Sequence, residues 1–382
     1  MRKSMAAGAA AAVLAGLLGA AGPVSADTVS ADTVSAAGAD SAASGACRPA
    51  LTVLGALPGP EVGWPREGVR ALGTGNLSVG SSRGRAAYWT GTTVHRVPVP
   101  AGDESSELLA VNAGGLMTGR YRTAGSTSWV GFTYRAGDPA VTPLPAPADA
   151  FAGLDVNASG RVAATSSTRE GVVVVVGGAV ERNLTFPTGI GADARVDNLG
   201  GINARGDVVA TVTWPEPDTG GRVEHSVPVL WPGDGGPARI LPATGNTAWV
   251  ADVAADGTVV GSDWFGFGYE WSPRVWAGTD GSLGSPAPLS THPSTSLDGI
   301  SPTTGVATGT ARKHIDDLHL TEQAVLWPGT GPVLALPRLA DGQPAEGVAV
   351  SDDDRVGGNA VNARGKTRAV VWKCASRQAY QP

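Results

Sequence analysis

The sequence predicts an all-β fold built from one four-stranded antiparallel unit that is repeated along the chain. A pattern of short alternating strands recurs with a period of about 46 residues. One turn position in most units is occupied by Gly, Asn or Asp, the residues that best tolerate a positive φ. The 55 Gly and 28 Pro suit many short strands and tight turns. We therefore expect a seven-bladed β-propeller of four-stranded antiparallel blades.

The N-terminal residues 1–26 have the features of a secretory signal peptide. Arg2 and Lys3 supply the positive end, residues 5–21 are apolar, and Ala26 closes a small-residue cleavage motif. The alternative is a membrane anchor, but the apolar run is short and rich in Gly. We expect cleavage near Ala26, an extracellular protein, and no membrane span in the rest of the chain.

The next segment, residues 27–46, predicts a disordered leader rather than a packed domain. The pentapeptide DTVSA occurs twice in succession and is followed by Ala, Ser and Gly. Such a segment has too little apolar bulk to offset the entropy of ordering. We expect a single propeller domain over residues 47–374 and a C-terminal tail over residues 375–382.

The charge of the chain argues against some partner classes. The formal net charge is −6, and no run of Lys and Arg occurs after the signal segment. A nucleic-acid-binding surface normally requires clustered basic residues. We therefore expect no nucleic-acid partner.

The repeat is clearest in residues 201–211, which read GINARGDVVAT. An apolar entry strand is followed by a turn and then by a second strand with alternating side chains. The turn predicts a residue of positive φ at equivalent places: Asn76, Gly115, Gly160, Gly206, Gly257 and Asp354. The sixth unit departs from this pattern, with Thr304-Gly305 and one apparent inserted residue.

The third strand of a unit often ends in tryptophan. Because these residues share one repeat position, we expect them to pack between neighbouring blades: Trp89, Trp231, Trp276, Trp327 and Trp372.

The seventh unit lacks a fourth strand, and the beginning of the domain supplies a candidate. Residues 51–58, LTVLGALP, resemble the fourth strand of the sixth unit, VLALP at 333–337. If this N-terminal strand completes the last blade, the ring closes and no sheet edge is left open.

The two cysteines agree with this closure. Cys47 comes just before the N-terminal strand, and Cys374 lies two residues after Trp372. Two cysteines in an exported protein are expected to pair. The alternative, a lipidated Cys47, lacks the usual upstream Leu and lies far beyond the apolar core of the signal.

Units of the form Asp-x-Asn-x-x-Gly-x-Val-Val-Gly followed by Ala-x-Leu-Trp resemble the HAF-type repeats of bacterial secreted proteins. The resemblance covers roughly residues 51–374. It implies a propeller-like architecture and transfers no catalytic motif.

Several short motifs resemble reactive sites without their usual context. Residues 80–84 match G-x-S-x-G, but they connect two strands rather than a strand and a helix. The segment 314–319, HIDDLH, offers metal ligands, but a solvated loop between the second and third strands is the favoured interpretation. Calcium at 352–354, DDD, competes with a turn-forming role. We therefore predict no catalytic residue, metal site or cofactor.

The other six tryptophans do not repeat, and they mark the candidate site. In such a blade the loops between second and third strands share one face with the blade-to-blade connections. Trp129, Trp214, the aromatic loop of the fifth unit and residues 314–319 belong to that face. The predicted ligand-binding residues are Trp214, Trp264, Phe265, Phe267, Tyr269 and Trp271.

Flat aromatic side chains with nearby acids suit stacking on sugar rings or capture of a peptide. The alternative is that the rings cover the ends of the blades. The leading hypothesis is a monomeric, non-catalytic binding module for a glycan or an extracellular protein. Two alternatives are a cell-surface scaffold and a polysaccharide hydrolase or lyase, which would use Asp263, Glu270, Asp316 and His319.

Overall fold

The computed structural model describes residues 47–60, 64–100, 102–216, 224–244, 247–265, 270–278, 281–314 and 320–382. All of them belong to the unit Ala46–Pro382. The expected signal peptide (1–26) and leader (27–46) lie outside the described residues. Within the described ranges, no helix has the length and apolar character needed to cross a membrane.

The described chain is all-β apart from one four-residue helix, α1 (Ala375–Gln378). Five antiparallel sheets contain four strands each. The first two hold β2 (Gly68–Leu72), β3 (Leu77–Ser82), β4 (Arg85–Thr90) and β5 (Thr93–Arg96); and β6 (Asp103–Val111), β7 (Met117–Thr123), β8 (Val130–Tyr134) and β9 (Thr142–Pro143). The other three hold β10 (Ala148–Val156), β11 (Val162–Ser166), β12 (Val172–Val176) and β13 (Ala179–Leu184); β22 (Ser294–Ile300), β23 (Ala307–His314), β24 (Leu320–Trp327) and β25 (Leu334–Ala335); and β26 (Ala345–Val350), β27 (Arg355–Val361) and β28 (Thr367–Lys373) with β1 (Ala50–Val53).

The remaining strands form one sheet of eight rather than the two separate blades expected from the sequence. It holds β14 (Arg195–Ile202), β15 (Val208–Pro215), β16 (Glu224–Trp231), β17 (Arg239–Ile240), β18 (Thr247–Val253), β19 (Val259–Phe265), β20 (Glu270–Trp276) and β21 (Leu283–Gly284). The two halves meet at one parallel pair, Ser226 with Thr247. Because β17 pairs only with Val229 and Leu230, the start of β16 is left open to β18. The sheets described therefore number six.

The N-terminal strand lies where the sequence predicts it. β1 pairs antiparallel with β28, with Ala50 opposite Lys373 and Val53 opposite Val370. Cys47 and Cys374 form a disulfide. The last sheet therefore combines strands from both ends of the described chain.

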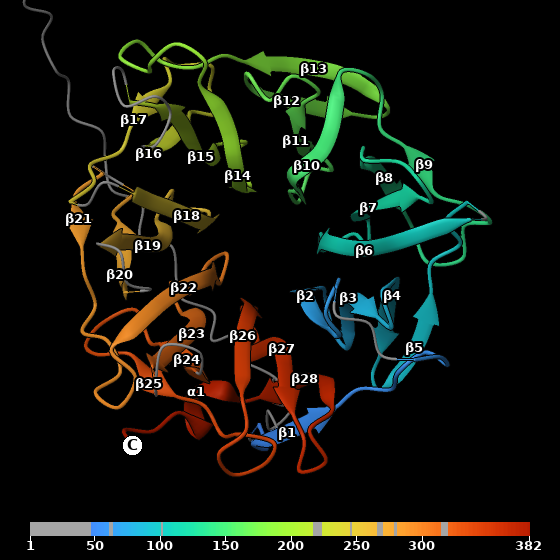
Figure 1. The fold of residues 1–382 in the computed structure, drawn as a ribbon, viewed down its shortest axis with the longest axis vertical. Helices are drawn as coiled ribbons and strands as arrows, with labels where there is room; N and C mark the ends of the chain where they lie inside the picture. The colour runs from blue at the N-terminus through green and yellow to red at the C-terminus, as the bar shows by residue number, and fades with distance from the viewer. Residues whose placement is uncertain are drawn as a thin grey trace, which may run out of the picture. The chain divides into compact units, whose positions relative to one another are not determined.

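The first strands of successive units contact each other: β2 with β6, β6 with β10, β10 with β14, β14 with β18, β18 with β22, β22 with β26, and β26 with β2. Figure 1 shows these strands around a common centre, with the short fourth strands on the outside. This arrangement is propeller-like. It brings residues from distant parts of the sequence together at the two ends of the first strands.

The repeated tryptophans pack between units, as expected. Trp89, Trp231, Trp276 and Trp372 are buried. Each indole N–H donates to a carbonyl just beyond the fourth strand of the neighbouring four-strand unit, at 2.6–2.8 Å: Gly55, Thr185, Pro242 and Pro337. Gly55 follows β1, so β1 serves the last sheet as a fourth strand. Trp327 differs, because it donates to Gly331 of its own unit.

The repeated turn makes a second link between units. The side-chain amide of Asn112 donates to the carbonyl of Asn157, that of Asn157 to Asn203, and that of Asn203 to Ala254, each at 2.9 Å. The Oδ1 atom of each Asn accepts backbone N–H groups of its own turn. Each Asn side chain therefore stabilises its own turn through Oδ1 and links it to the turn of the next unit through its amide N–H.

The predicted positive φ is found at Gly115, Gly160, Gly206, Gly257 and Asp354. The prediction for Asn76 is wrong, because the preceding residue, Gly75, adopts a φ of 62° instead. In the divergent sixth unit Gly305 takes this role, with a φ of 73°. Glycine adopts a positive φ at little steric cost, so Gly75 and Gly305 take this conformation and the neighbouring residue does not have to.

The C-terminal segment beyond Cys374 packs on the last two sheets. Asp354 accepts hydrogen bonds from the backbone N–H and the hydroxyl of Ser376. Tyr380 and Ala335 exchange two backbone hydrogen bonds, so the tail covers part of the β25 edge.

Replacing both Cys47 and Cys374 with Ser should lower the free energy of unfolding. The bridge spans 327 residues, and closing so long a loop is worth about 5 kcal/mol on the chain-entropy model. Urea unfolding of the oxidised wild type, the reduced wild type and the double variant measures the effect. Two free thiols in the purified wild type, or equal unfolding midpoints for all three samples, would contradict this role.

Candidate functional site

We call the loop face the end of the sheets at which the second strand of each unit is joined to the third. The first strands begin at this same end, since Arg195 of β14 pairs with Thr213 near the end of β15. Of the predicted aromatic residues, Trp214, Trp264 and Trp271 are described, and they belong to this face.

Two of the predicted site residues form a cross-strand pair. Trp264 on β19 is opposite Trp271 on β20, and their rings are stacked at a centroid distance of 6.3 Å. The backbone of Phe265 pairs with Glu270. The side chain of Phe265, and all of Phe267 and Tyr269, lie outside the described residues. Trp264 and Trp271 therefore lie on the two paired strands of the hairpin rather than in the loop between them.

Trp214 mainly covers the end of its own sheet. Its ring stacks on His225, the opposite residue on β16, at 5.2 Å. It also packs on the core beside Phe186 and Ile190. A Cβ atom on Gly191 would lie 2.2 Å from the Trp214 ring, so this glycine permits the close packing. These contacts match the alternative interpretation, in which the ring closes off a blade.

The structure adds a second aromatic cluster on the loop face, which we call the platform: Trp64, Trp129, Phe151, Arg120 and Arg169. The rings of Trp64 and Trp129 meet edge to face at 5.2 Å. The Arg120 guanidinium carbon lies 5.6 Å and 4.8 Å from their centroids, and that of Arg169 lies 4.4 Å from the Phe151 centroid. Trp64 is 51% exposed and Phe151 is 48% exposed. Two exposed aromatic rings are thus each backed by an arginine.

The platform arginines are held firmly by neighbouring strands. Nε and Nη2 of Arg120 donate to Glu107 of β6, and Nη1 donates to the carbonyls of Ala150 and Phe151 on β10. Arg169 donates twice to the carbonyl of Val196 on β14. Side chains fixed in this way lose little entropy when a ligand binds.

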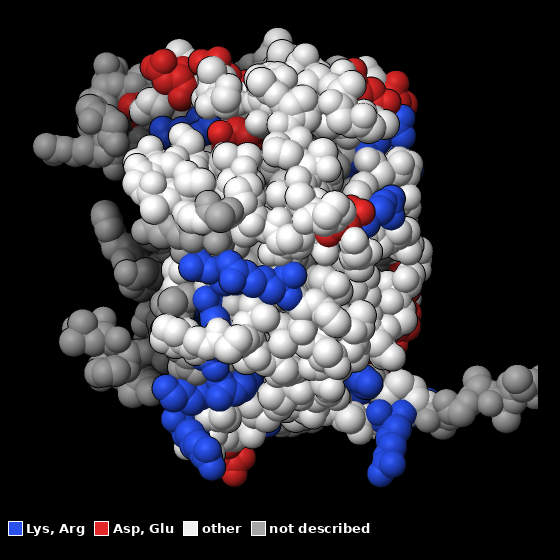
Figure 2. Space-filling model, turned by 90° about the vertical axis from the view of Figure 1, so that its right-hand side faces the viewer, with Lys and Arg blue, Asp and Glu red and all other residues white. Residues whose placement is uncertain are grey.

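Three platform residues, Trp64, Arg120 and Trp129, belong to a stretch of the sequence with a positive net charge. Residues 64–143 contain eight Arg, no Lys and five acidic residues, a net charge of +3 in a chain whose net charge is −6. Figure 2 shows Lys and Arg side chains gathered in the lower half of the side that carries β5 and β9, with the visible Asp and Glu mainly above them. This local excess of positive charge is not apparent from the net charge of the whole chain, which is negative.

Of the four residues considered for a hydrolase, only Asp263 and Glu270 belong to the described part of the chain, and their surroundings differ. Asp263 is fully buried, and its Oδ2 accepts hydrogen bonds from Arg274 at 2.6 Å and from the Thr244 hydroxyl at 2.7 Å. Glu270 is exposed at the start of β20, and Asp316 and His319 lie outside the described residues. Nor does the described part of the chain contain three His, Cys, Asp or Glu side chains grouped for a metal ion.

A different carboxyl pair lies between β24 and β26, formed by Glu322 and Glu346. Burial and the neighbouring Glu346 charge raise the pKa of Glu322. Burial also acts on Glu346, but hydrogen bonding from Asn359 at 2.8 Å and the charge of Arg66 at 2.9 Å lower its pKa. One carboxyl group thus favours its protonated form beside another that favours its ionised form.

Two further carboxylates face each other across the first strands. A Cβ atom on Gly201 of β14 would lie 3.0 Å from Asp155 of β10 and 3.1 Å from Asp252 of β18. Asp155 accepts a hydrogen bond from the Ile202 N–H, and Asp252 accepts one from the Ile300 N–H. Burial, and then repulsion from Asp155, raise the pKa of Asp252 to about 7.

Comparisons with known proteins give no family for this chain. No protein-family model matches it, and no curated protein does either. Among solved structures it resembles TolB from Acinetobacter baumannii, at 12% identity and a TM-score of 0.40, over 78% of this chain and 60% of that one. It also resembles the dihydro-heme d1 dehydrogenase NirN, at 13% identity and a TM-score of 0.45, over 80% and 72% of the two chains.

A third similar structure is a gluconolactonase from Xanthomonas campestris, at 15% identity and a TM-score of 0.41, over 72% of this chain and 92% of that one. This chain spans about 60% of the length of the TolB chain. Since all three TM-scores are below 0.5, none of these proteins transfers a function.

The platform and the carboxyl pairs are not identified from the sequence, and the structure shows why. Trp64 and Trp129 are two of the six tryptophans that do not repeat, but the arginine that contacts both rings comes from the strand β7 between them in the sequence. Acids on entry strands, such as Glu346 and Asp252, interrupt an otherwise apolar segment of the repeat. That interruption is the signal that could have identified them.

Replacing Asp252 with Asn should flatten the pH dependence of stability. In the unfolded chain the pKa of Asp252 is near 3.8, and in the fold it is about 7. The folded state therefore binds the proton more tightly, so the free energy of unfolding falls as pH rises between these values. Denaturant unfolding at pH 5 and pH 8 should show a smaller difference in the variant than in the wild type.

The exposed-turn variant Asp138→Asn serves as the control and should keep the wild-type difference. An unchanged pH dependence in Asp252→Asn would refute the assignment.

Proposed function

We propose that the described unit is a seven-bladed β-propeller whose ring is closed by β1. The eight-stranded sheet then counts as two blades, because β14–β17 and β18–β21 each repeat the four-strand order of the other sheets. Closure is supported by the contact of β26 with β2 and by the hydrogen bond from Trp89 to Gly55 beyond β1.

This propeller is an exported, monomeric binding module of the HAF-repeat type. Support for export comes from the Cys47–Cys374 disulfide, since such bonds persist in oxidising compartments, and from the signal-like N-terminal sequence. The HAF assignment rests on the repeated turn and tryptophan positions.

The module binds a polysaccharide on the loop face. The observation that carries this function is the platform, where the exposed rings of Trp64 and Phe151 lie over arginines held in place by neighbouring strands. Aromatic faces suit the apolar faces of sugar rings, and fixed guanidinium groups suit their hydroxyl and carboxyl groups. The Trp264–Trp271 pair extends the aromatic surface of the same face.

Replacing both Trp64 and Phe151 with Ala should weaken polysaccharide binding roughly tenfold, because each aromatic contact is worth about 0.5–1.5 kcal/mol. Pull-down with insoluble cell-wall polysaccharide and a glycan array measure the change. Trp264→Ala with Trp271→Ala tests the second aromatic pair in the same assays.

The matched controls Val176→Ala and Tyr380→Ala remove exposed apolar side chains elsewhere and should bind as the wild type does. Wild-type binding by the Trp64/Phe151 double variant would remove the platform from the site. Binding to a protein but to no glycan would reassign the ligand class.

The Glu322–Glu346 pair favours one alternative, a polysaccharide hydrolase or lyase. A protonated carboxyl beside an ionised one is the arrangement that acid–base catalysis requires. Release of reducing ends or unsaturated products from a polysaccharide, abolished by Glu322→Gln, would favour the enzyme. Binding without product release, retained in Glu322→Gln, favours the module.

A further inference from the structure

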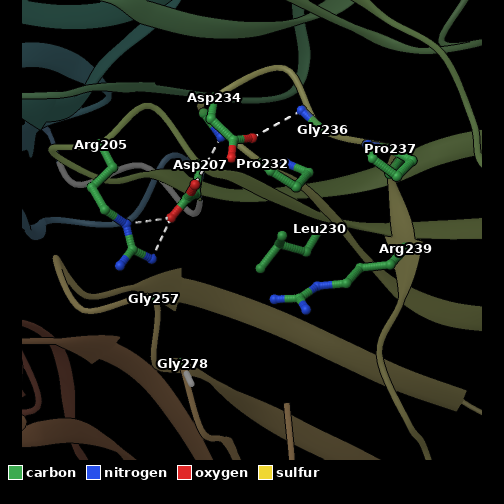
Figure 3. Close-up of a pocket in the computed structure, with 12 residues that line it drawn as sticks. Arg205, Asp207, Leu230, Pro232, Asp234, Gly236, Pro237, Arg239, Gly257 and Gly278 are labelled. Atoms are coloured by element: carbon green, nitrogen blue, oxygen red, sulfur yellow. Dashed lines mark hydrogen bonds and ion pairs between the residues drawn. The ribbon is translucent and has the colours of Figure 1, made fainter. Parts of the chain in front are cut away.

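A cavity lies at the other end of the strands, away from the loop face. It has a volume of about 720 Å³, within the usual range for small-molecule sites. It forms where the turn between β14 and β15 meets the connection from β16 to β17 and two turns of the next unit, at Gly257 and Gly278. Figure 3 shows its polar side chains: Arg205, Asp207, Asp234 and Arg239.

Arg205 is positioned before any ligand arrives. Its Nε and Nη2 atoms donate to Asp207 Oδ2 at 2.9 Å and 2.5 Å, and its Nη1 atom donates to the Asp256 carbonyl at 3.0 Å. A Cβ atom on Gly257 would lie 2.3 Å from Nη2, so a larger residue at this position would displace the guanidinium group from its present place. This ion pair is a fixed wall of the cavity.

Asp207 stays ionised at neutral pH. Although burial acts to raise its pKa, hydrogen bonds from the Gly233 N–H, Asn203 and Arg205 lower it. Its negative charge therefore neutralises Arg205, and the fixed ion pair adds little net charge to the cavity.

Arg239 provides the charge that is not neutralised. It is exposed on β17, and within the described ranges it has no hydrogen-bond or ion-pair partner. Figure 3 shows its side chain extended below Leu230 toward the side of the cavity that holds Arg205. A guanidinium group presents parallel donors that match the two oxygens of a carboxylate.

The other walls suit the skeleton of a small hydroxylated ligand. Leu230, Pro232 and Pro237 supply apolar surface beside the arginine. Asp234 holds its turn through one oxygen, which accepts the Gly236 N–H at 2.8 Å. Because a carboxylate has several acceptor positions, Asp234 can also receive hydroxyl groups of a ligand.

We propose that this cavity is a binding site for a small hydroxylated carboxylate of the uronic acid class. Arg239 pairs with the carboxylate, Asp234 accepts hydroxyl groups, and the two prolines pack against the sugar ring. The site is separate from the loop face and uses a different probe, so either proposal can fail while the other stands.

Calorimetric titration with D-glucuronate tests the site, with D-glucose and D-glucuronamide as neutral counterparts. Glucuronate should bind the wild type, and both neutral sugars should bind at least tenfold more weakly. Arg239→Gln should reduce glucuronate affinity at least tenfold, since the variant keeps a polar side chain but loses the guanidinium group and its positive charge.

Arg135→Gln is the control, because Arg135 is an exposed arginine of another unit, between its third strand, β8, and its fourth strand, β9. It should bind glucuronate as the wild type does. Equal affinities for glucuronate and glucose, unchanged binding by Arg239→Gln, or tighter binding of inorganic phosphate in competition would overturn the proposal. No heat of binding at millimolar glucuronate would overturn it as well.

Discussion

The hydrogen bond between a buried tryptophan and the preceding sheet is the interaction on which the arrangement depends. Each sheet is too thin to form a core alone and must bury its faces against its neighbours. Trp231 illustrates the solution, because its ring packs among side chains of the preceding sheet while its N–H donates to Thr185. The large apolar ring supplies buried contact area between neighbouring units, and its single N–H donor fixes their alignment.

The asparagine turns hold the same neighbours at the same end of the strands, since Trp231 pairs with Val208, which directly follows the Asn203 turn. Asn157 donates to the carbonyl of Asn203 and accepts the N–H groups of its own turn. With the tryptophans and asparagines holding adjacent sheets, the loop-face connections are free to vary. Both candidate sites use residues that differ from unit to unit, such as Trp64 and Arg239.

Much of the scaffold could be predicted from the sequence because its interactions repeat. The burial of Trp89, the pairing of β1 with β28 and the bond between Cys47 and Cys374 all follow from comparing units. The shift from Asn76 to Gly75 could not be predicted, because either residue tolerates a positive φ. The single Ser226–Thr247 pair that fuses two blades depends on local spacing that no repeat pattern records.

The candidate sites were less predictable, because they join residues that are distant in sequence and occur once. Trp64 precedes β2 whereas Arg120 lies on β7, and the turn residue Arg205 meets Gly257 of the next unit. Residues 201–211 predicted a scaffold turn, and Asn203 confirms that role. The same turn also carries the Arg205–Asp207 pair that forms a wall of the cavity.

The pairing of β1 with β28 has a consequence for the order of assembly. Most sheets contain strands that are close in sequence, so they can form while the chain is still emerging. The last sheet needs strands from both ends of the described chain and must wait for Thr367–Lys373. Such long-range pairing costs the most loop-closure entropy and folds slowly. Until then the edges of β1 and β27 stay open, and this interval is when the protein is most exposed to aggregation.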